Sequence, residues 1–195
     1  MITVQDVTPG LREGGPRALV LPGAGYSAQG PVLYWTIEAL LKDGFRVSAV
    51  AWEFDEQARR DPRSFVESAV EQALGEMGEW PDLVVTKSVS SYASQRFVAR
   101  GIPGIWWTPL LAVPAIGEAL RAATSDHLVL GGTADASWRP EELAGSAAKV
   151  ISAEGGTHSM EFPSRGWRAS VEEQGGLVEA VIAHVRALAF NGGAV

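Results

Sequence analysis

Three side chains suited to acyl transfer follow three separate apolar segments of the sequence. Ser88 comes directly after the apolar run at 83–85. Asp135 follows a later apolar segment, and His158 lies in a glycine-flanked stretch near the end of the chain. A serine hydroxyl is a weak nucleophile until a histidine within hydrogen-bond reach accepts its proton, and a carboxylate keeps that histidine in one tautomer. The pattern predicts Ser88 as nucleophile, His158 as general base and Asp135 as the group that orients it.

Two serines and a lysine close to Ser88 have other interpretations. Ser90 and Ser91 fall after the expected turn, where a serine hydroxyl more often caps a helix than attacks a substrate. Lys87 directly precedes Ser88, and the sequence leaves open whether it is an exposed surface lysine or a group that acts beside the nucleophile. Ser88 therefore remains the predicted nucleophile.

The acid and the base are selected by their positions relative to the expected strands. His127 precedes a strand and His184 lies within the last expected helix, so His158 is the histidine at the correct end of the sheet. Asp126 comes before its strand, whereas Asp135 comes after it. In the sequence Gly-Thr-Ala-Asp, Asp135 also suits a turn or a helix cap, and this alternative stays open.

The segment around Ser88 predicts a strand, a sharp turn and a helix. The short run at 83–85 is typical of a buried parallel strand. Residues 92–100 predict a helix that turns Phe97 and Val98 inward and ends at Gly101. Such a turn lifts the serine hydroxyl above the sheet and brings helix N–H groups near it, where they can bind an oxyanion.

Strand and helix segments alternate along the rest of the chain, which predicts an α/β protein with a mostly parallel sheet and helices on both faces. We expect one domain over 1–195, with no repeat, linker or inserted cap domain. The expected strands are 1–7 (an antiparallel edge strand), 18–21, 45–52, 83–85, 104–111, 127–132 and 147–152. The first expected helix begins after Gly30 and ends at the segment 42–44. The later expected helices cover 62–77, 92–100, 114–123 and 177–190.

Composition excludes several classes of function. The net charge of -7 and the scattered 16 Lys and Arg residues argue against a nucleic-acid surface. The chain contains 0 cysteines, so disulfides and thiolate metal sites are excluded, and a reducing compartment is compatible with it. The first residues lack the pattern of a signal peptide, and no apolar run reaches a membrane-spanning length. We therefore expect a cytoplasmic protein without a membrane partner, and the oligomeric state stays open.

Three short motifs resemble those of the α/β-hydrolase family. Thr86-Lys87-Ser88-Val89-Ser90 is similar to its nucleophile elbow, Gly131-Gly132-Thr133-Ala134-Asp135 to its acid-bearing turn, and Gly155-Gly156-Thr157-His158-Ser159 to its histidine loop. The elbow departs from the family pattern at Thr86 and Ser90, where glycines are usual. We nevertheless predict that Ser88 adopts the strained backbone of the elbow, with its Oγ facing His158 and the Val89 N–H facing the pocket.

The resemblance implies a small serine hydrolase without a lid. It would cleave an ester or related acyl bond of a small molecule through an acyl-enzyme on Ser88, without a cofactor or metal. The N–H groups of Ala24 and Val89 would form the oxyanion hole, and Gly25 would keep the backbone close. The glycines at 22–26 also fit a plain strand-to-helix turn, and both interpretations stay open.

Side chains after the expected strand at 104–111 are predicted to wall the acyl pocket. The carboxyl ends of parallel strands line the ligand crevice of such sheets. Trp107, Thr108 and Leu110 are therefore expected to line it together with Gly25 and Tyr26, whereas Trp106 is more typical of a core residue.

Two other functions remain possible on the same scaffold. Thr86 and Ser90 in the elbow suggest a catalytically silent scaffold that binds a small molecule or a partner protein. A cofactor-free lyase or peroxidase with the same triad has the same sequence pattern. Fold does not decide among these functions.

Overall fold

The computed structural model describes residues 1–10 and 14–190, and a seven-stranded sheet forms the centre of this part of the chain. The strand order is β1-β3-β2-β4-β5-β6-β7, and β1 is antiparallel to β3 while all other pairs are parallel. This confirms the mostly parallel sheet and its antiparallel edge strand. The strands are β1 (Ile2–Asp6), β2 (Arg17–Leu21), β3 (Arg46–Trp52), β4 (Leu83–Lys87), β5 (Gly104–Trp107), β6 (His127–Gly132) and β7 (Lys149–Ala153).

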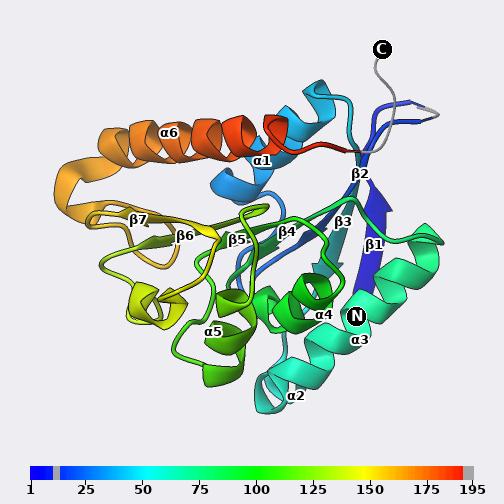
Figure 1. Ribbon diagram of the computed structural model, residues 1–195, viewed down its shortest axis with the longest axis horizontal. Helices are drawn as coiled ribbons and strands as arrows, with labels where there is room; N and C mark the ends of the chain where they lie inside the picture. Colours follow the sequence, from blue (N-terminus) through cyan, green and yellow to red (C-terminus); the bar gives the residue numbers. More distant parts are fainter. Residues whose placement is uncertain (11–13, 191–195) are drawn as a thin grey trace.

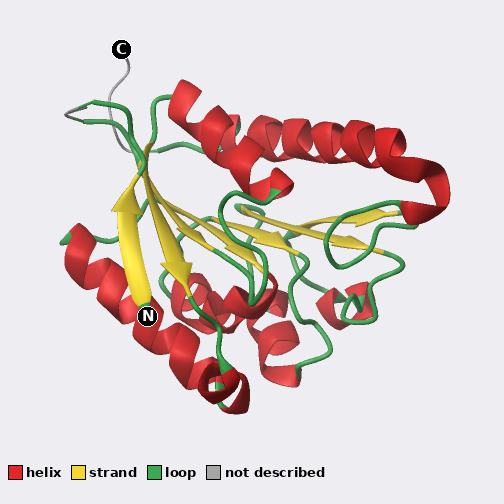
Figure 2. Ribbon diagram, turned by 180° about the vertical axis from the view of Figure 1, so that it is seen from behind, coloured by secondary structure: helices red, strands yellow, loops and turns green. Residues whose placement is uncertain are grey.

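Helices cover both faces of the sheet (Figure 1). One face carries α1 (Pro31–Lys42) and α6 (Gly166–Arg186). The other carries α3 (Pro62–Met77), α4 (Ser94–Ala99) and α5 (Pro114–Arg121), with the short α2 (Glu56–Arg60) before α3. The view from behind shows the same two helical layers (Figure 2). Three 3₁₀ helices complete the described elements: η1 (Ser88–Ala93), η2 (Pro140–Leu143) and η3 (Pro163–Arg165).

Local sequence signals explain where several helices begin. A proline occupies the first turn of α1, α3 and α5, where its missing N–H costs no hydrogen bond. Asp61 caps α3, because its Oδ1 accepts a hydrogen bond from the Ser64 N–H at 3.1 Å. α3 ends at Gly78, whose φ of 72° is the left-handed conformation that glycine adopts without strain.

Apolar side chains pack on both faces of the sheet, so the central strands are buried on both sides. In β4, Leu83 and Val85 face the layer of α1 and α6, and Val84 faces the layer of α3, α4 and α5. All three are fully buried, and each stabilises the fold by about 1.5–3 kcal/mol. This double burial holds the end of β4, and the serine after it, in a fixed place.

Three elements differ from the sequence-based expectation. α6 begins at Gly166 rather than at 177. The sequence did not predict its first half, because that half is largely exposed and has no apolar periodicity. The helix expected over 92–100 starts as the 3₁₀ helix η1 directly at Ser88. β5 ends at Trp107, since Thr108 turns into a left-handed conformation with φ of 41°. None of the described helices is both long and apolar enough to cross a membrane.

Candidate active site

Ser88, His158 and Asp135 meet at the carboxyl-terminal edge of the parallel strands. Ser88 follows β4, Asp135 follows β6, and His158 follows β7. The Ser88 Oγ lies 2.6 Å from Nε2 of His158, and Nδ1 of His158 lies 2.6 Å from Oδ2 of Asp135. The three groups form one continuous hydrogen-bond chain, although up to 70 residues of sequence separate them.

The backbone of Ser88 adopts the strained conformation that the sequence comparison with nucleophile elbows predicted. Its φ is 58°, a left-handed value that is uncommon outside glycine. The Oγ of Ser90 accepts a hydrogen bond from the Lys87 N–H at 2.8 Å, and its own proton is directed to the carbonyl oxygen of Leu21 or Lys87. Ser90 therefore stabilises the turn by bonding the backbone at the start of η1, whereas the sequence suggests that it caps the helix expected over 92–100.

Thr86 occupies the elbow position where the family usually has glycine. It lies in β4 and is fully buried. Its Oγ1 has no hydrogen-bond partner within residues 1–10 and 14–190, which costs about 1–3 kcal/mol for a buried hydroxyl. The turn therefore forms with threonine at this position, at a cost in stability.

Two glycine-rich loops bring Asp135 and His158 together. A Cβ at Gly132 would lie 2.0 Å from the carbonyl oxygen of Gly156, so only glycine permits this approach. The same oxygen accepts a hydrogen bond from the Ala134 N–H at 2.9 Å. The glycines of both motifs thus serve the close contact between the loop after β6 and the loop after β7.

The carboxyl group of Asp135 is held in its ionised form. Its burial opposes ionisation, but hydrogen bonds from His158 and from the Ser137 N–H, together with the positive charge of Lys87, outweigh burial and lower the pKa of Asp135 below its usual value. An ionised Asp135 accepts the Nδ1 proton of His158. This leaves Nε2 free to accept a proton from Ser88.

The residues predicted for an oxyanion hole lie beside Ser88 in the chain or in the loop after β2. Val89 is the second residue of η1, where a helix N–H lacks a partner within its own helix. Ala24 lies in a turn that the Gly23 N–H closes by donating to the Tyr26 carbonyl oxygen at 2.8 Å, and Gly25 is exposed. The Tyr26 hydroxyl accepts a hydrogen bond from the Val32 N–H at 3.1 Å.

The predicted pocket residues after β5 occupy different surroundings. Trp107 packs in the core beneath α1 and α6, and neither Trp107 nor Thr108 has any exposed surface. A side chain without exposed surface cannot line an open pocket, so these two predictions disagree with the structure. Leu110 is partly exposed, and its N–H donates to the Ser91 Oγ at 3.1 Å, which gives Ser91 a structural role.

The remaining histidines are bound in other contacts. His127 is buried, and its Nδ1 accepts a hydrogen bond from the indole N–H of Trp106 at 3.1 Å. The ring of His184 lies 3.2 Å from Nζ of Lys149 and 3.2 Å from the carbonyl oxygen of Asp126. No group of three or more His, Asp or Glu side chains in the described part of the chain is arranged to hold a metal ion.

Lys87 is a buried member of the site that the sequence left undecided. Its side chain is 1% exposed, which is incompatible with a surface lysine. Nζ lies 2.5 Å from Oγ1 of Thr108 and 2.7 Å from the carbonyl oxygen of His158. Burial lowers the pKa of Lys87 from 10.5 to about 7, although the charge of Asp135 opposes this shift.

The lowered pKa of Lys87 predicts a specific pH dependence of stability. Between about pH 7 and 10.5 the unfolded chain binds one proton more than the folded chain at this site. The free energy of unfolding should therefore rise with pH across this window, by at most about 1.4 kcal/mol per pH unit. Urea denaturation between pH 7 and 9.5 measures this effect. The free energy of unfolding of the wild type should rise relative to that of Lys87→Met as the pH increases, because the variant lacks the titrating group.

Lys42→Met provides the matched control, because Lys42 is exposed on α1. Its pH profile should run parallel to that of the wild type. If the free energy of unfolding of Lys87→Met also changed with pH in parallel with that of the wild type, this would contradict the lowered pKa of Lys87.

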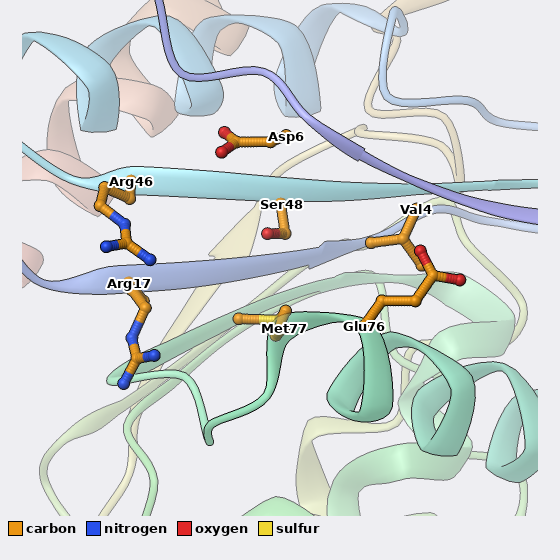
Figure 3. Close-up of a pocket in the computed structure, with 7 residues that line it drawn as sticks. All are labelled: Val4, Asp6, Arg17, Arg46, Ser48, Glu76 and Met77. Atoms are coloured by element: carbon orange, nitrogen blue, oxygen red, sulfur yellow. The ribbon is translucent and has the colours of Figure 1, made fainter. Parts of the chain in front are cut away.

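A separate cavity lies at the opposite edge of the sheet (Figure 3). Arg17 and Arg46, the first residues of β2 and β3, lie at one end of it, and Val4 and Glu76 lie at the other. The guanidinium of Arg17 pairs with Glu79. Because this cavity adjoins the beginnings of the parallel strands, it is remote from Ser88 and does not belong to the triad.

Comparison with known proteins identifies the fold. No family model and no curated protein matches the sequence. Among solved structures, the chain is similar to a protein from Thermoplasma acidophilum described as a predicted CIB-like hydrolase (15% identity, 96% of this chain and 93% of that chain, TM-score 0.67). It is also similar to Est1E from Butyrivibrio proteoclasticus (11% identity, 95% and 94%, TM-score 0.67).

A third similar structure is XC6422 from Xanthomonas campestris, described as an α/β serine hydrolase without a lid (17% identity, 95% and 87%, TM-score 0.57). These identities are too low to transfer an activity, but the shared topology is extensive. The chain has the α/β-hydrolase fold.

Proposed function

Because the chain has the α/β-hydrolase fold, we propose that it is a serine hydrolase that cleaves an ester or related acyl bond through an acyl-enzyme on Ser88. The observation that carries this proposal is the continuous hydrogen-bond chain from Ser88 through His158 to Asp135. It lies at the carboxyl edge of the sheet, where ligands of open α/β sheets bind.

Each member of the chain has a defined step in the proposed reaction. The Oγ of Ser88 attacks the acyl carbon while Nε2 of His158 takes its proton, and Asp135 stabilises the imidazolium that forms. His158 then gives this proton to the leaving alcohol, which departs as the acyl-enzyme forms. Water attacks the acyl-enzyme in the second half, with His158 again as base, and releases the acid.

The negative charge on the tetrahedral intermediate requires donors close to Ser88. We assign this role to the backbone N–H groups of Val89 and Ala24, which lie at the start of η1 and in the turn after β2. A single oxyanion donor contributes about 10²–10³ in kcat in a serine protease. Tyr26, Gly25 and Leu110 are partly or fully exposed near these elements and are proposed to contact a small acyl substrate.

A catalytically silent scaffold that binds a small molecule or a partner is the second candidate. The unpaired buried hydroxyl of Thr86, at an elbow position that glycine usually occupies, favours it. In that case the strained turn would be retained without turnover, and Ser88 would not react as a nucleophile.

Reaction with a fluorophosphonate probe separates the two candidates. We expect the probe to add one phosphonyl group to the wild type, and peptide mass spectrometry should locate it on Ser88, because His158 activates this hydroxyl. Ser88→Ala should remain unlabelled, whereas Ser68→Ala, which changes an exposed serine of α3, should be labelled at the wild-type rate. An unlabelled wild type would favour the silent scaffold.

A further inference from the structure

Backbone strain in the described part of the chain is concentrated around Lys87. The non-glycine residues with positive φ in this part are Ser88 (58°), Thr108 (41°) and Met160 (60°). Ser88 follows Lys87 directly, Thr108 binds Lys87 Nζ through its hydroxyl, and Met160 comes two residues after His158. Strained residues persist only where their surroundings fix them, and they cluster at functional sites.

The ammonium group of Lys87 connects three segments that are distant in sequence. It belongs to β4, and it donates to Oγ1 of Thr108 after β5 and to the carbonyl oxygen of His158 after β7. Nζ also lies 4.9 Å from the ring centroid of Tyr26. Two oxygen acceptors and one aromatic face thus surround the three protons of the ammonium.

Retaining a charge at this place lowers stability, because burial of a cation is costly without a partner ion. The charged and titratable residues around it are Asp135, whose charge acts through space, His158, which offers its carbonyl oxygen, and Tyr26, which offers its ring. A methionine has a similar length and no charge, and would fill the same space without this cost. Packing alone therefore gives no reason for a lysine at position 87.

We propose that Lys87 is a positioning residue: its ammonium holds the main chain of His158 against the ends of β4 and β5, and so keeps Nε2 within reach of the Ser88 Oγ. The inference rests on the proposed hydrolase function and deepens it. His158 needs such an anchor because its side chain is 39% exposed and its loop lies at the edge of the sheet. Lys87 is 1% exposed, so we assign it a positioning role and no contact with substrate.

The test compares Lys87→Met, Lys87→Gln and the control Lys42→Met with the wild type on an aryl acetate ester. We expect Lys87→Met to lower kcat about 10- to 100-fold, since a displacement near 1 Å costs up to about 100-fold. KM should change less than about threefold, because the affected contact is made with His158 and not with substrate. Lys87→Gln keeps a donor and should recover part of kcat, and Lys42→Met should behave as wild type.

Thermal unfolding and the rate of fluorophosphonate labelling complete the test. The unfolding temperature of Lys87→Met should stay near that of the wild type at pH 7, because loss of the buried charge offsets the acceptors of Thr108 and His158 that lose their donor. Its labelling rate should fall in parallel with kcat. A kcat within twofold of wild type, or a fall in kcat that Lys87→Gln does not recover, would overturn the inference. If Lys87→Met does not fold, Lys87→Gln and Thr108→Ala decide the question. Each weakens the anchor in part and should lower kcat relative to the wild type, and a kcat within twofold of wild type in both variants would overturn the inference.

Failure of the inference about Lys87 can be distinguished from failure of the proposed hydrolase function. An active, labelled wild type together with an equally active Lys87→Met overturns the role of Lys87 alone. A wild type that neither turns over esters nor reacts at Ser88 overturns the hydrolase proposal, and the role of Lys87 with it.

Discussion

Ser88→Ala is expected to abolish ester turnover while the protein stays folded. The loss in kcat should be on the order of 10⁶-fold, as for removal of the nucleophile from a serine protease with the same set of groups. His158 and the oxyanion donors remain in this variant, but they cannot form the covalent intermediate. Turnover is measured with an aryl ester at saturating concentration, and folding is checked by urea denaturation.

The change is expected to have little effect on stability. Ser88 is 8% exposed, and an alanine at φ of 58° is strained to a similar degree as serine. The lost hydrogen bond to His158 is partly replaced by water, because the imidazole is partly exposed. Ser68→Ala serves as the control for removal of an unrelated hydroxyl. Esterase activity in Ser88→Ala equal to that of the wild type would remove Ser88 from the mechanism.

Much of the fold could be predicted from short apolar segments and their boundaries. The three apolar residues of β4 have glycine or proline residues before them and a small-residue turn after them, which is typical of a buried parallel strand. The first half of α6 could not be predicted in this way. Residues 166–176 include Gly175 and Gly176 and contain few apolar side chains, so neither propensity nor periodicity indicates a helix there.

The order of Ser88, Asp135 and His158 could be recognised because each follows a strand, and parallel strands end at one edge. The site of Lys87 could not be recognised. Its environment is formed by Thr108 and by a carbonyl group 71 residues further along the chain. Such a contact leaves no local pattern, and a lysine beside a turn is more often exposed.

The pocket prediction was wrong for Trp107 and Thr108 for a related reason. A residue at the end of a parallel strand can point to the crevice, but it can also point into one of the two helical layers. Trp107 packs beneath α1 and α6, and Thr108 turns its hydroxyl toward Lys87. The direction of the Thr108 side chain depends on its own backbone, which is left-handed although threonine is β-branched.

Asp135→Asn is expected to lower kcat by about 10⁴-fold, the loss seen when the same change is made in a serine protease triad. The two oxygens of Asp135 have different partners: Oδ1 accepts from the Ser137 N–H at 2.8 Å, and Oδ2 faces Nδ1 of His158 at 2.6 Å. An asparagine has only one oxygen. If that oxygen stays with Ser137, the amide N–H₂ faces Nδ1, and the proton of His158 must move to Nε2.

An imidazole protonated at Nε2 cannot accept the proton of Ser88, so catalysis is lost although the hydrogen bonds remain. For that reason the free energy of unfolding at pH 7 should stay near the wild-type value, while kcat falls and KM changes little. Asp126→Asn is the matched control, because Asp126 is exposed and precedes β6. A near-normal kcat in Asp135→Asn would mean that another carboxylate orients His158.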